Sequence, residues 1–351
     1  MLKQARNLVR AIVPWNRPYE LIEIMVGIGL NAKKKGYGQF LRSGLSAIGH
    51  SDRVMGLPVH ITIEPISFCN LECPVCETGA GIIKRQQGTM SMDLYTRVIT
   101  EVGKYANIIF LYWMGEPFLN KNIYKMADIA KDRGIWVDTC TNGEVVKPVS
   151  LALSGFSRVS FQFGGMSPAT HAEYRVKGDW GRALHNLCRT HDIAKKHDVS
   201  QVGAGLIVMK HNEHEIERFI DFMDGYGVKQ VELISPCVRT LEQAEKFLPE
   251  DRKYWLYDEK ELKAGRLVPK VRPKNSCPWI YFSTVIAWDG TVYPCCRDAD
   301  GEFPMGNIKE ESLDVIWNGS RYRDFRRRIS RDQKNVSICR LCSGFGVPLL
   351  H

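Results

Sequence analysis

Hydrophobic and polar positions follow two alternating rhythms along most of this chain. Short apolar runs typical of buried strands are separated by amphipathic stretches with helical periodicity. We interpret six runs as strands, at residues 60–66, 107–113, 135–139, 158–163, 202–209 and 228–235. Helices are predicted between them at 91–106, 120–133, 148–154, 180–196 and 213–226. Repeated strand–helix units of this length predict parallel strands with right-handed crossovers, in a doubly wound sheet or an open, partial barrel.

The rhythm is absent on both sides of this α/β region, which we place at residues 58–236. Residues 237–273 are charged and helix-prone, and we interpret them as a connector. A hairpin is predicted at 281–294 with Asp289-Gly290 as its turn, followed by helices at 312–317 and 320–329. We therefore expect residues 274–351 to form a small separate module and residues 1–57 to form a helical N-terminal extension.

Length and composition narrow the class of protein. A chain of 351 residues with 44% hydrophobic and 25% charged residues is globular and buries enough apolar surface to fold without disulfides. Its eleven Cys therefore indicate metal ligands or catalysts in a reducing compartment, and we expect a cytoplasmic protein. No signal peptide is recognised, and no run approaches the length of uncharged apolar residues that spans a bilayer.

The net charge of +9 is unevenly placed. Residues 1–57 hold nine Lys or Arg against three acids, and a second basic run lies at 321–331. The first region mixes these charges with apolar residues, so it is either an interfacial helix that touches the inner face of a membrane or a helix packed against the barrel. We interpret the second run as a solvated helix face. Nucleic acid is not expected as a partner, because basic residues and stacking aromatics are interleaved only at 321–328.

Three Cys follow the first predicted strand at a distinctive spacing, Cys69-x3-Cys73-x2-Cys76. Three thiolates on one short loop can hold a compact metal centre. A structural zinc site needs four ligands, so zinc would have to borrow a distant one. A cubane iron–sulfur cluster has four irons, and three protein ligands would leave one iron open.

This motif resembles the signature of the radical S-adenosylmethionine (SAM) superfamily, and the resemblance covers residues 58–236. It implies a partial (β/α)6 barrel and a 4Fe–4S cluster held by the three Cys. It also implies reductive cleavage of SAM to a 5′-deoxyadenosyl radical that removes a hydrogen atom from a substrate. Val75 departs from the family, because many members have an aromatic residue there.

Other motifs agree with the resemblance and suggest how SAM is held. Met114-Gly115-Glu116-Pro117 is similar to the G-G-E-P motif, in which backbone and Glu groups hold the methionyl ammonium, although Met114 replaces a Gly. Thr141-Asn142-Gly143 matches a T-N-G motif at the end of the third strand. The resemblance further implies ribose contacts and a carboxylate partner, made by Ser160, Gln162 and Arg175.

A second set of Cys lies in the C-terminal region, as Cys277-x12-Gly290-x4-Cys295 and Cys339-x2-Cys342. It resembles the SPASM/twitch extension of radical SAM enzymes, which implies one auxiliary 4Fe–4S cluster; a zinc ribbon is the alternative. We place Cys296 outside the ligand set, because its side chain points away from that of Cys295 if the strand continues. The isolated thiols are expected to be small buried hydrophobes: Cys140, Cys188 and Cys237.

Together these features predict a radical SAM oxidoreductase in which the auxiliary cluster oxidises the product radical, with dehydrogenation as the expected reaction. Residues 1–57 lack the strand-rich module that binds leader peptides, so we expect a non-peptide substrate: a small molecule, a lipid or a tetrapyrrole. An electron donor such as flavodoxin or ferredoxin is implied. The alternatives are a peptide-modifying maturase and a non-catalytic zinc-binding protein. No catalytic side chain beyond these cofactor sites is identified.

Overall fold

The computed structural model describes residues 37–271, 275–342 and 349–350, which lie around one sheet. Its strands follow the order β10-β6-β5-β4-β3-β2-β1-β7-β8-β9. The six predicted strands are all present and neighbouring ones run parallel: β1 (His60–Ile63), β2 (Ile108–Phe110), β3 (Trp136–Thr141), β4 (Arg158–Phe163), β5 (Gln201–Ile207) and β6 (Gln230–Ile234). Because β1 and β6 are not neighbours in this order, the six strands form an open, partial barrel, as predicted.

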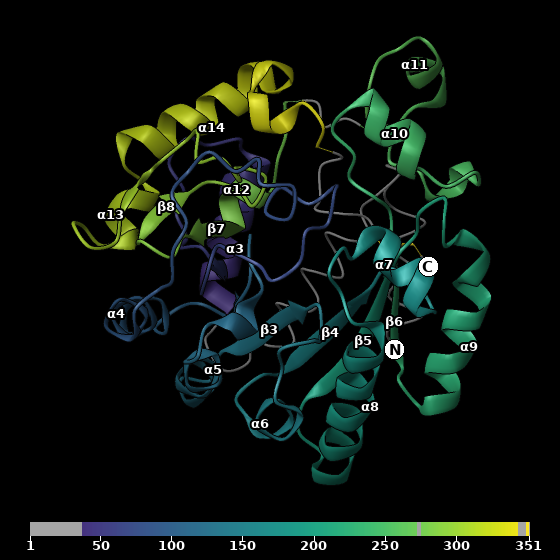
Figure 1. The fold of residues 1–351 in the computed structure, drawn as a ribbon. Helices are drawn as coiled ribbons and strands as arrows, with labels where there is room; N and C mark the ends of the chain where they lie inside the picture. Colours follow the sequence, from purple (N-terminus) through teal and green to yellow (C-terminus); the bar gives the residue numbers. More distant parts are fainter. Residues whose placement is uncertain (1–36, 272–274, 343–348, 351) are drawn as a thin grey trace, which may run out of the picture.

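Five helices cover the outer face of these strands (Figure 1), and all five were predicted: α4 (Met92–Val102), α5 (Ile123–Asp132), α6 (Pro148–Leu153), α8 (Trp180–His197) and α9 (Ile216–Tyr226). α4 begins where Ser91 accepts a hydrogen bond from the backbone N–H of Leu94 at 3.2 Å, and its apolar face is buried. A sixth helix, α7 (Pro168–Tyr174), was not predicted; it is short and carries no apolar periodicity. The carboxyl ends of the strands are therefore left for the loops that carry the Cys and Gly motifs.

The C-terminal hairpin continues the barrel sheet, and the expected division of the chain into modules stays a prediction. β7 (Ser283–Ile286) pairs with β1 in parallel over four residues, and β8 (Thr291–Tyr293) and β9 (Gly306–Asn307) follow antiparallel. At the other end of the sheet, β10 (Leu349–Leu350) pairs with β6. The turn falls at Asp289-Gly290 as predicted, and Gly290 has a φ of +90° that favours glycine.

The remaining elements lie at the ends of the barrel. The connector contains α10 (Leu241–Phe247) and α11 (Glu259–Lys263), and the C-terminal region contains α12 (Trp279–Phe282), α13 (Leu313–Trp317) and α14 (Ser320–Asp332). Single 3-10 turns occur at Pro117–Leu119, Glu213–Glu215, Arg252–Tyr254, Gln333–Asn335 and Ser337–Cys339. Of the predicted N-terminal extension, only α3 (Tyr37–Ile48) and the loop after it are described; residues 1–36 lie outside the described residues.

The basic run on α14 is not simply a solvated face. Arg326 is 1% exposed and its guanidinium stacks 4.3 Å from the Trp317 ring. Arg323 and Arg327 form ion pairs with Asp52 at 3.3 and 2.7 Å. The interpretation as a solvated face is therefore wrong for Arg326, whereas Arg323 and Arg327 stay partly exposed and attach α14 to the loop after α3.

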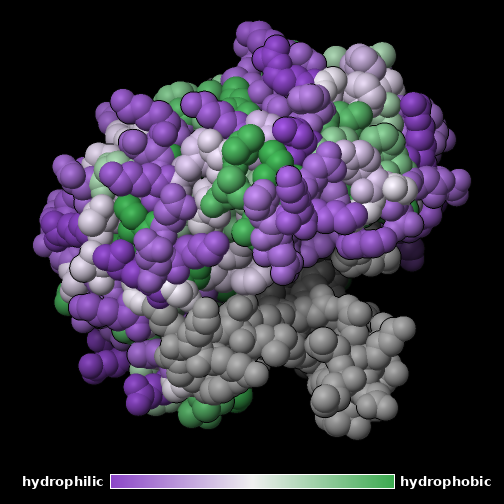
Figure 2. All heavy atoms as spheres, turned by 90° about the horizontal axis from the view of Figure 1, so that it is seen from below, coloured by the Kyte–Doolittle hydropathy of each residue, from purple (hydrophilic) through white to green (hydrophobic). Residues whose placement is uncertain are grey.

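The surface is mostly hydrophilic on the face seen from below, and hydrophobic residues gather there in separate patches (Figure 2). Within the described ranges, no helix combines the length and the apolar composition that a bilayer-spanning segment needs.

Candidate functional site

The loop that carries Cys69, Cys73 and Cys76 follows β1 and is tightly wound. The backbone N–H of Leu71 donates to the Sγ of Cys69 at 3.4 Å, and the N–H of Cys76 donates to the carbonyl of Cys73 at 3.2 Å. Cys73 is buried and the other two are half-buried. Burial raises the pKa of Cys69 to about 12, so this thiol is protonated without metal, and metal binding must release its proton.

Gly115 lies against this loop at a distance that only glycine allows. A Cβ at Gly115 would stand 2.5 Å from the carbonyl oxygen of Ile66 and 2.7 Å from that of Phe68. The next residue, Glu116, donates its backbone N–H to Phe68 at 3.0 Å. The Gly115-Glu116-Pro117 turn is therefore fixed to the backbone one residue before Cys69.

The Glu116 carboxylate joins the ends of β2 and β3. It accepts hydrogen bonds from the hydroxyl of Thr141 and the backbone N–H of Asn142, both at 2.8 Å, and from the N–H of Phe118 at 3.2 Å. Burial raises the pKa of Glu116 to about 7, and these hydrogen bonds oppose the rise. The sequence predicted a contact with SAM; the structure adds that this carboxylate positions the Thr141-Asn142-Gly143 turn.

Asn142 completes the connection, because its side chain reaches the Cys loop. Its Nδ2 donates to Asn70 Oδ1 at 2.8 Å and lies 3.9 Å from the Sγ of Cys69. Asn70 in turn donates to Glu144 at 3.3 Å. Motifs that follow three different strands thus meet at Cys69. Asn70 and Glu144 were missed by the sequence reasoning, although Asn70 is adjacent to the first Cys.

Arg175 approaches the same loop from the end of α7. Its Nη1 lies 3.8 Å from the Sγ of Cys73, while its Nε is buried and has no hydrogen-bond partner among the described residues. A buried guanidinium N–H without an acceptor fits an anionic ligand that is not part of the chain, such as the carboxylate of SAM.

Ser160 and Gln162 are placed differently from the other predicted SAM contacts. Gln162 donates to Ser160 at 2.8 Å, and Ser160 donates to Glu232 on β6 at 3.4 Å. These side chains can reach across β5 because β5 has Gly203 and Gly205 beside them; a Cβ at Gly205 would stand 2.5 Å from the Gln162 side chain. Within the described residues, these hydrogen bonds form a polar network along the sheet and do not extend to the Cys69–Cys76 loop.

Arg158 is the charged centre of this network. It pairs with Asp138 at 2.7 Å and with Glu232 at 2.9 Å. Burial raises the pKa of Asp138 to about 6, and the charge of Arg158 opposes that rise. The network joins β3, β4 and β6, and we did not expect it from the sequence.

The second Cys set comes from three parts of the C-terminal region. Cys277 precedes α12, Cys295 follows β8, and Cys342 donates its backbone N–H to the carbonyl of Cys339 at 3.1 Å. Burial raises the pKa of Cys277 to about 12, and the neighbouring Cys342 and Cys339 add to the rise. The charges of Cys339 and Cys342 thus act on Cys277, and those of Cys342 and Cys277 act on Cys295.

Cys296 does not point away from Cys295 along a strand, because β8 ends at Tyr293 and both Cys lie in the turn that follows. The premise for its orientation is therefore wrong, and its thiol interacts directly with that of Cys295. The carbonyl of Cys296 accepts a hydrogen bond from Nε1 of Trp113 at 2.8 Å. The three isolated Cys are half-buried rather than buried, and Cys237 lies 3.7 Å from Nη1 of Arg297.

Among the described residues, no three or more Cys, His, Asp or Glu side chains form a site for a single metal ion. A cubane cluster contacts each thiolate through a different iron, so its ligands stand farther apart than those of one zinc ion.

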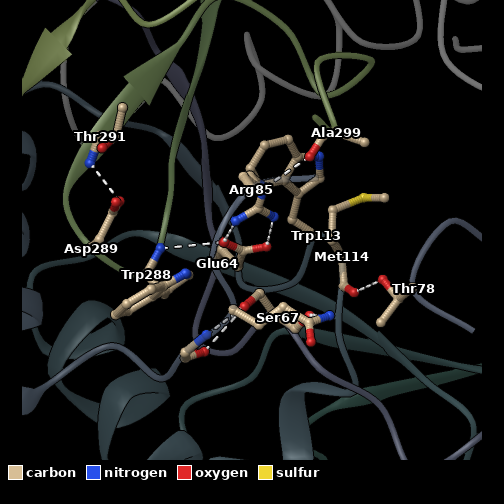
Figure 3. A network of polar contacts seen from close by, with 12 residues as sticks. Glu64, Ser67, Thr78, Arg85, Trp113, Met114, Trp288, Asp289, Thr291 and Ala299 are labelled. Carbon is tan, nitrogen blue, oxygen red and sulfur yellow. Dashed lines mark hydrogen bonds and ion pairs between the residues drawn. The ribbon is translucent and has the colours of Figure 1, made fainter. Parts of the chain in front are cut away.

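A buried ion pair links the two Cys-bearing regions (Figure 3). Arg85 donates to both oxygens of Glu64, which lies just after β1, and its Nε donates to the carbonyl of Ala299 at 2.8 Å. Glu64 also accepts from the N–H of Trp288 in the hairpin at 3.3 Å. The Arg85 guanidinium lies 4.4 Å from the centre of the Trp113 ring. This pair joins the loop after β1 to the turn that follows Cys295 and Cys296.

A cavity of about 190 Å³ lies between the same two regions. It is lined by residues that follow Cys76, by residues that follow Cys296, by the connector, and by residues on both sides of Cys339. The lining includes three arginines and one cysteine: Arg239, Arg297, Arg340 and Cys237.

Comparison with protein families gives two matches on separate parts of the chain. Residues 63–223 match the radical SAM superfamily, and residues 277–343 match an iron–sulfur cluster-binding domain, SPASM. The first range contains the first Cys set. The second range begins at Cys277 and contains the whole second Cys set.

Curated relatives are distant but cover most of the chain. The chain is 22% identical to the tungsten-containing aldehyde ferredoxin oxidoreductase cofactor-modifying protein of Pyrococcus furiosus, over 76% of this chain and 83% of that protein. It is 24% identical to the AdoMet-dependent heme synthase of Methanosarcina barkeri, over 81% and 88%.

Among solved structures, Streptococcus suis SuiB bound to S-adenosylmethionine aligns with a TM-score of 0.62 and 14% identity, covering 97% of this chain and 82% of that one. The structure of SuiB bound to precursor peptide SuiA gives a TM-score of 0.61 and 15% identity, covering 93% and 75%. At this identity the likeness shows the fold alone.

Proposed function

We propose a function from one premise: the chain belongs to the radical SAM superfamily and carries a C-terminal SPASM domain. Members of this superfamily are enzymes, and the cofactors are SAM and two iron–sulfur clusters. The protein is a radical SAM oxidoreductase that removes a hydrogen atom from a non-peptide substrate and completes a dehydrogenation. One observation carries the proposal: three motifs from the ends of β1, β2 and β3 converge on Cys69 through Glu116 and Asn142.

In this proposal, Cys69, Cys73 and Cys76 hold the first cluster as a 4Fe–4S cube. With SAM bound, this cluster would supply the electron for reductive cleavage of SAM, which precedes hydrogen-atom abstraction from the substrate. Three protein thiolates leave one iron for SAM. The close approach of Gly115 to the backbone before Cys69 supports the assignment, because it places the Glu116 turn directly against the loop.

The SAM contacts follow from the groups that face this loop. Arg175 offers a buried N–H without an acceptor, which suits the methionyl carboxylate. Glu116 offers negative charge near the ammonium and orients Asn142. Ser160 and Gln162 remain proposed ribose contacts, although their present hydrogen bonds run to Glu232 and to each other.

Cys277, Cys295, Cys339 and Cys342 hold the auxiliary cluster. With these four thiolates as ligands the cluster would have no open iron, and it would supply an acceptor for the electron that a dehydrogenation releases after hydrogen abstraction. The Glu64–Arg85 pair and the Trp113–Cys296 hydrogen bond support this role, since they fix the two Cys-bearing regions to each other. A flavodoxin or ferredoxin supplies the electron for SAM cleavage, and we place the protein in the cytoplasm.

We place the substrate, a small molecule in this proposal, in the cavity between the two regions. Its volume of about 190 Å³ is below the range of about 300–1,000 Å³ usual for drug-sized ligands. One observation supports the alternative of a peptide-modifying enzyme. The fold is similar to that of SuiB, whose structure was solved with a precursor peptide. Substrate experiments must therefore include both classes.

The test uses anaerobically reconstituted protein that is reduced in the presence of SAM. It should form 5′-deoxyadenosine and methionine slowly without substrate. Candidate small molecules and peptides carrying deuterium are then compared for transfer of deuterium into 5′-deoxyadenosine. Transfer from a peptide but from no small molecule would replace the proposed substrate class.

A paired variant tests the auxiliary cluster. Cys339→Ala with Cys342→Ala should leave SAM cleavage intact and abolish the dehydrogenated product, provided that circular dichroism shows a folded protein. Cys188→Ala, on α8, is the matched control. Full product formation by the double variant would remove the electron-acceptor role.

A further inference from the structure

Helix α3 packs Phe40 and Ala47 against the core and buries two serines beside them, yet it also turns aliphatic residues outward. Ser43 is 0% exposed and Ser46 is 2% exposed. Leu41 and Leu45 are each 61% exposed, and Ile48 is 80% exposed. An ordinary surface helix turns its apolar stripe toward the core.

The exposed residues form one continuous stripe. Leu41, Leu45 and Ile48 are spaced at i, i+4 and i+7, which places them on one helix face. Met55, in the loop after the helix, is 61% exposed. We call these four residues the α3 stripe. The helix itself is held in place, because Phe40 packs against Phe282 of α12 with ring centres 5.2 Å apart.

The charge beside the stripe is positive. Arg42 and Arg53 are exposed, and Lys33, Lys34 and Lys35 precede the helix in the sequence. The nearby acid, Asp52, already pairs with two arginines of α14. An apolar stripe bordered by Lys and Arg is the composition that binds the surface of an anionic bilayer.

Three partners could cover the α3 stripe: an anionic bilayer, the N-terminal segment of the same chain, or a second copy of the protein. Charge complementarity favours the bilayer. Residues 1–32 of the same chain carry four Lys or Arg and two acids, so they too would bring net positive charge to a positive surface. A second copy docked through the same face would also oppose like charges. We propose that the α3 stripe docks this protein on an anionic lipid bilayer, with α3 lying in the plane of the interface. The proposal does not depend on the substrate of the enzyme.

The test is sedimentation of the full-length, cluster-loaded protein with vesicles of phosphatidylcholine alone or mixed with phosphatidylglycerol. Wild type should sediment with the mixed vesicles and much less with phosphatidylcholine alone. Leu41→Ser/Leu45→Ser/Ile48→Ser should weaken binding at least about tenfold, because three apolar side chains are removed from the interface. Arg42→Gln/Arg53→Gln should weaken it about fivefold per charge.

A matched control exists on α6, where Val149 and Leu153 are 53% and 50% exposed at the same i, i+4 spacing. Val149→Ser/Leu153→Ser should bind vesicles like wild type. Ile48→Ser alone serves if the triple variant fails to fold, and it should still weaken binding several-fold. Equal binding by wild type and the stripe variants would overturn the proposal. So would a wild-type dimer that binds no vesicles and becomes a monomer in the stripe variants.

Discussion

The guanidinium of Arg85 donates hydrogen bonds to both oxygens of the Glu64 carboxylate. The side chains of Arg85 and Glu64 are only 8% and 0% exposed, respectively. Through Ala299 and Trp288 the pair also holds the turn after Cys296 and the β7–β8 hairpin. One buried pair thus fixes the distance between the two regions that carry the cysteines.

Removing one member of this pair should be costly. We expect Arg85→Ala to lower the free energy of unfolding by about 3–5 kcal/mol, because it leaves the Glu64 carboxylate buried without its counterion. Lys84→Ala is the matched control, since Lys84 is 81% exposed and lies 3.9 Å from Asp300; its effect should stay below about 1 kcal/mol. Anaerobic urea unfolding measures both. A loss in Arg85→Ala no larger than in the control would show that the pair is not needed to hold the regions together.

The first Cys set should account for half of the iron. Reconstituted wild type should contain about eight irons and matching sulfide, and Cys69→Ala/Cys73→Ala/Cys76→Ala should contain about four. Cys188→Ala should retain the wild-type amount. Iron and sulfide analysis after anaerobic desalting is sufficient. Retention of all the iron by the triple variant would refute the ligand assignment.

Glu116 should affect SAM binding through both its charge and its hydrogen bonds. Glu116→Ala removes three hydrogen bonds and the charge, and we expect it to weaken SAM binding by about 10–150-fold. Thr141→Val removes only one of these contacts and should have a smaller effect. Equilibrium dialysis with labelled SAM measures the affinities. Wild-type affinity in Glu116→Ala would mean that the Gly115-Glu116-Pro117 turn has no role in SAM binding.

His60 should make the fold sensitive to acid. Its ring lies 5.2 Å from that of Phe110 and 5.5 Å from that of Trp279, and neither nitrogen has a hydrogen-bond partner among the described residues. Burial lowers the pKa of His60 to about 3 in the folded protein. As the pH falls below about 6.5, His60 is therefore protonated in the unfolded chain but stays neutral in the folded protein. The stability due to neutral His60 is present above pH 6.5 and is lost as pH falls toward about 3.

The difference between wild type and His60→Phe isolates this effect from other titrating groups. Below about pH 6.5, wild type should lose up to about 1.4 kcal/mol per pH unit relative to the variant. Urea unfolding at several pH values down to about pH 5 gives the two curves. Parallel curves would show that His60 has the same pKa in the folded and the unfolded protein.

Local patterns predicted the barrel strands and the cysteine sets, because apolar runs and spacings are written in consecutive residues. Contacts between distant residues were not predictable in this way. Glu64 and Arg85 are 21 residues apart, and Asn70 and Asn142 are 72 apart, so no short pattern relates them. The orientation of Cys296 was misjudged because it depended on where β8 ends, and strand ends are the least certain part of a pattern.

The parallel pairing of β1 with β7 has a consequence for biosynthesis. Until residues 283–286 leave the ribosome, one edge of β1 has backbone N–H and C=O groups that β7 will later occupy. Such an edge is a template for pairing with other chains. A nascent or truncated chain that ends before β7 is therefore at risk of aggregation even when all six barrel strands are complete. The cluster-binding C-terminal region thus also protects an edge of the strand that precedes the first cysteine.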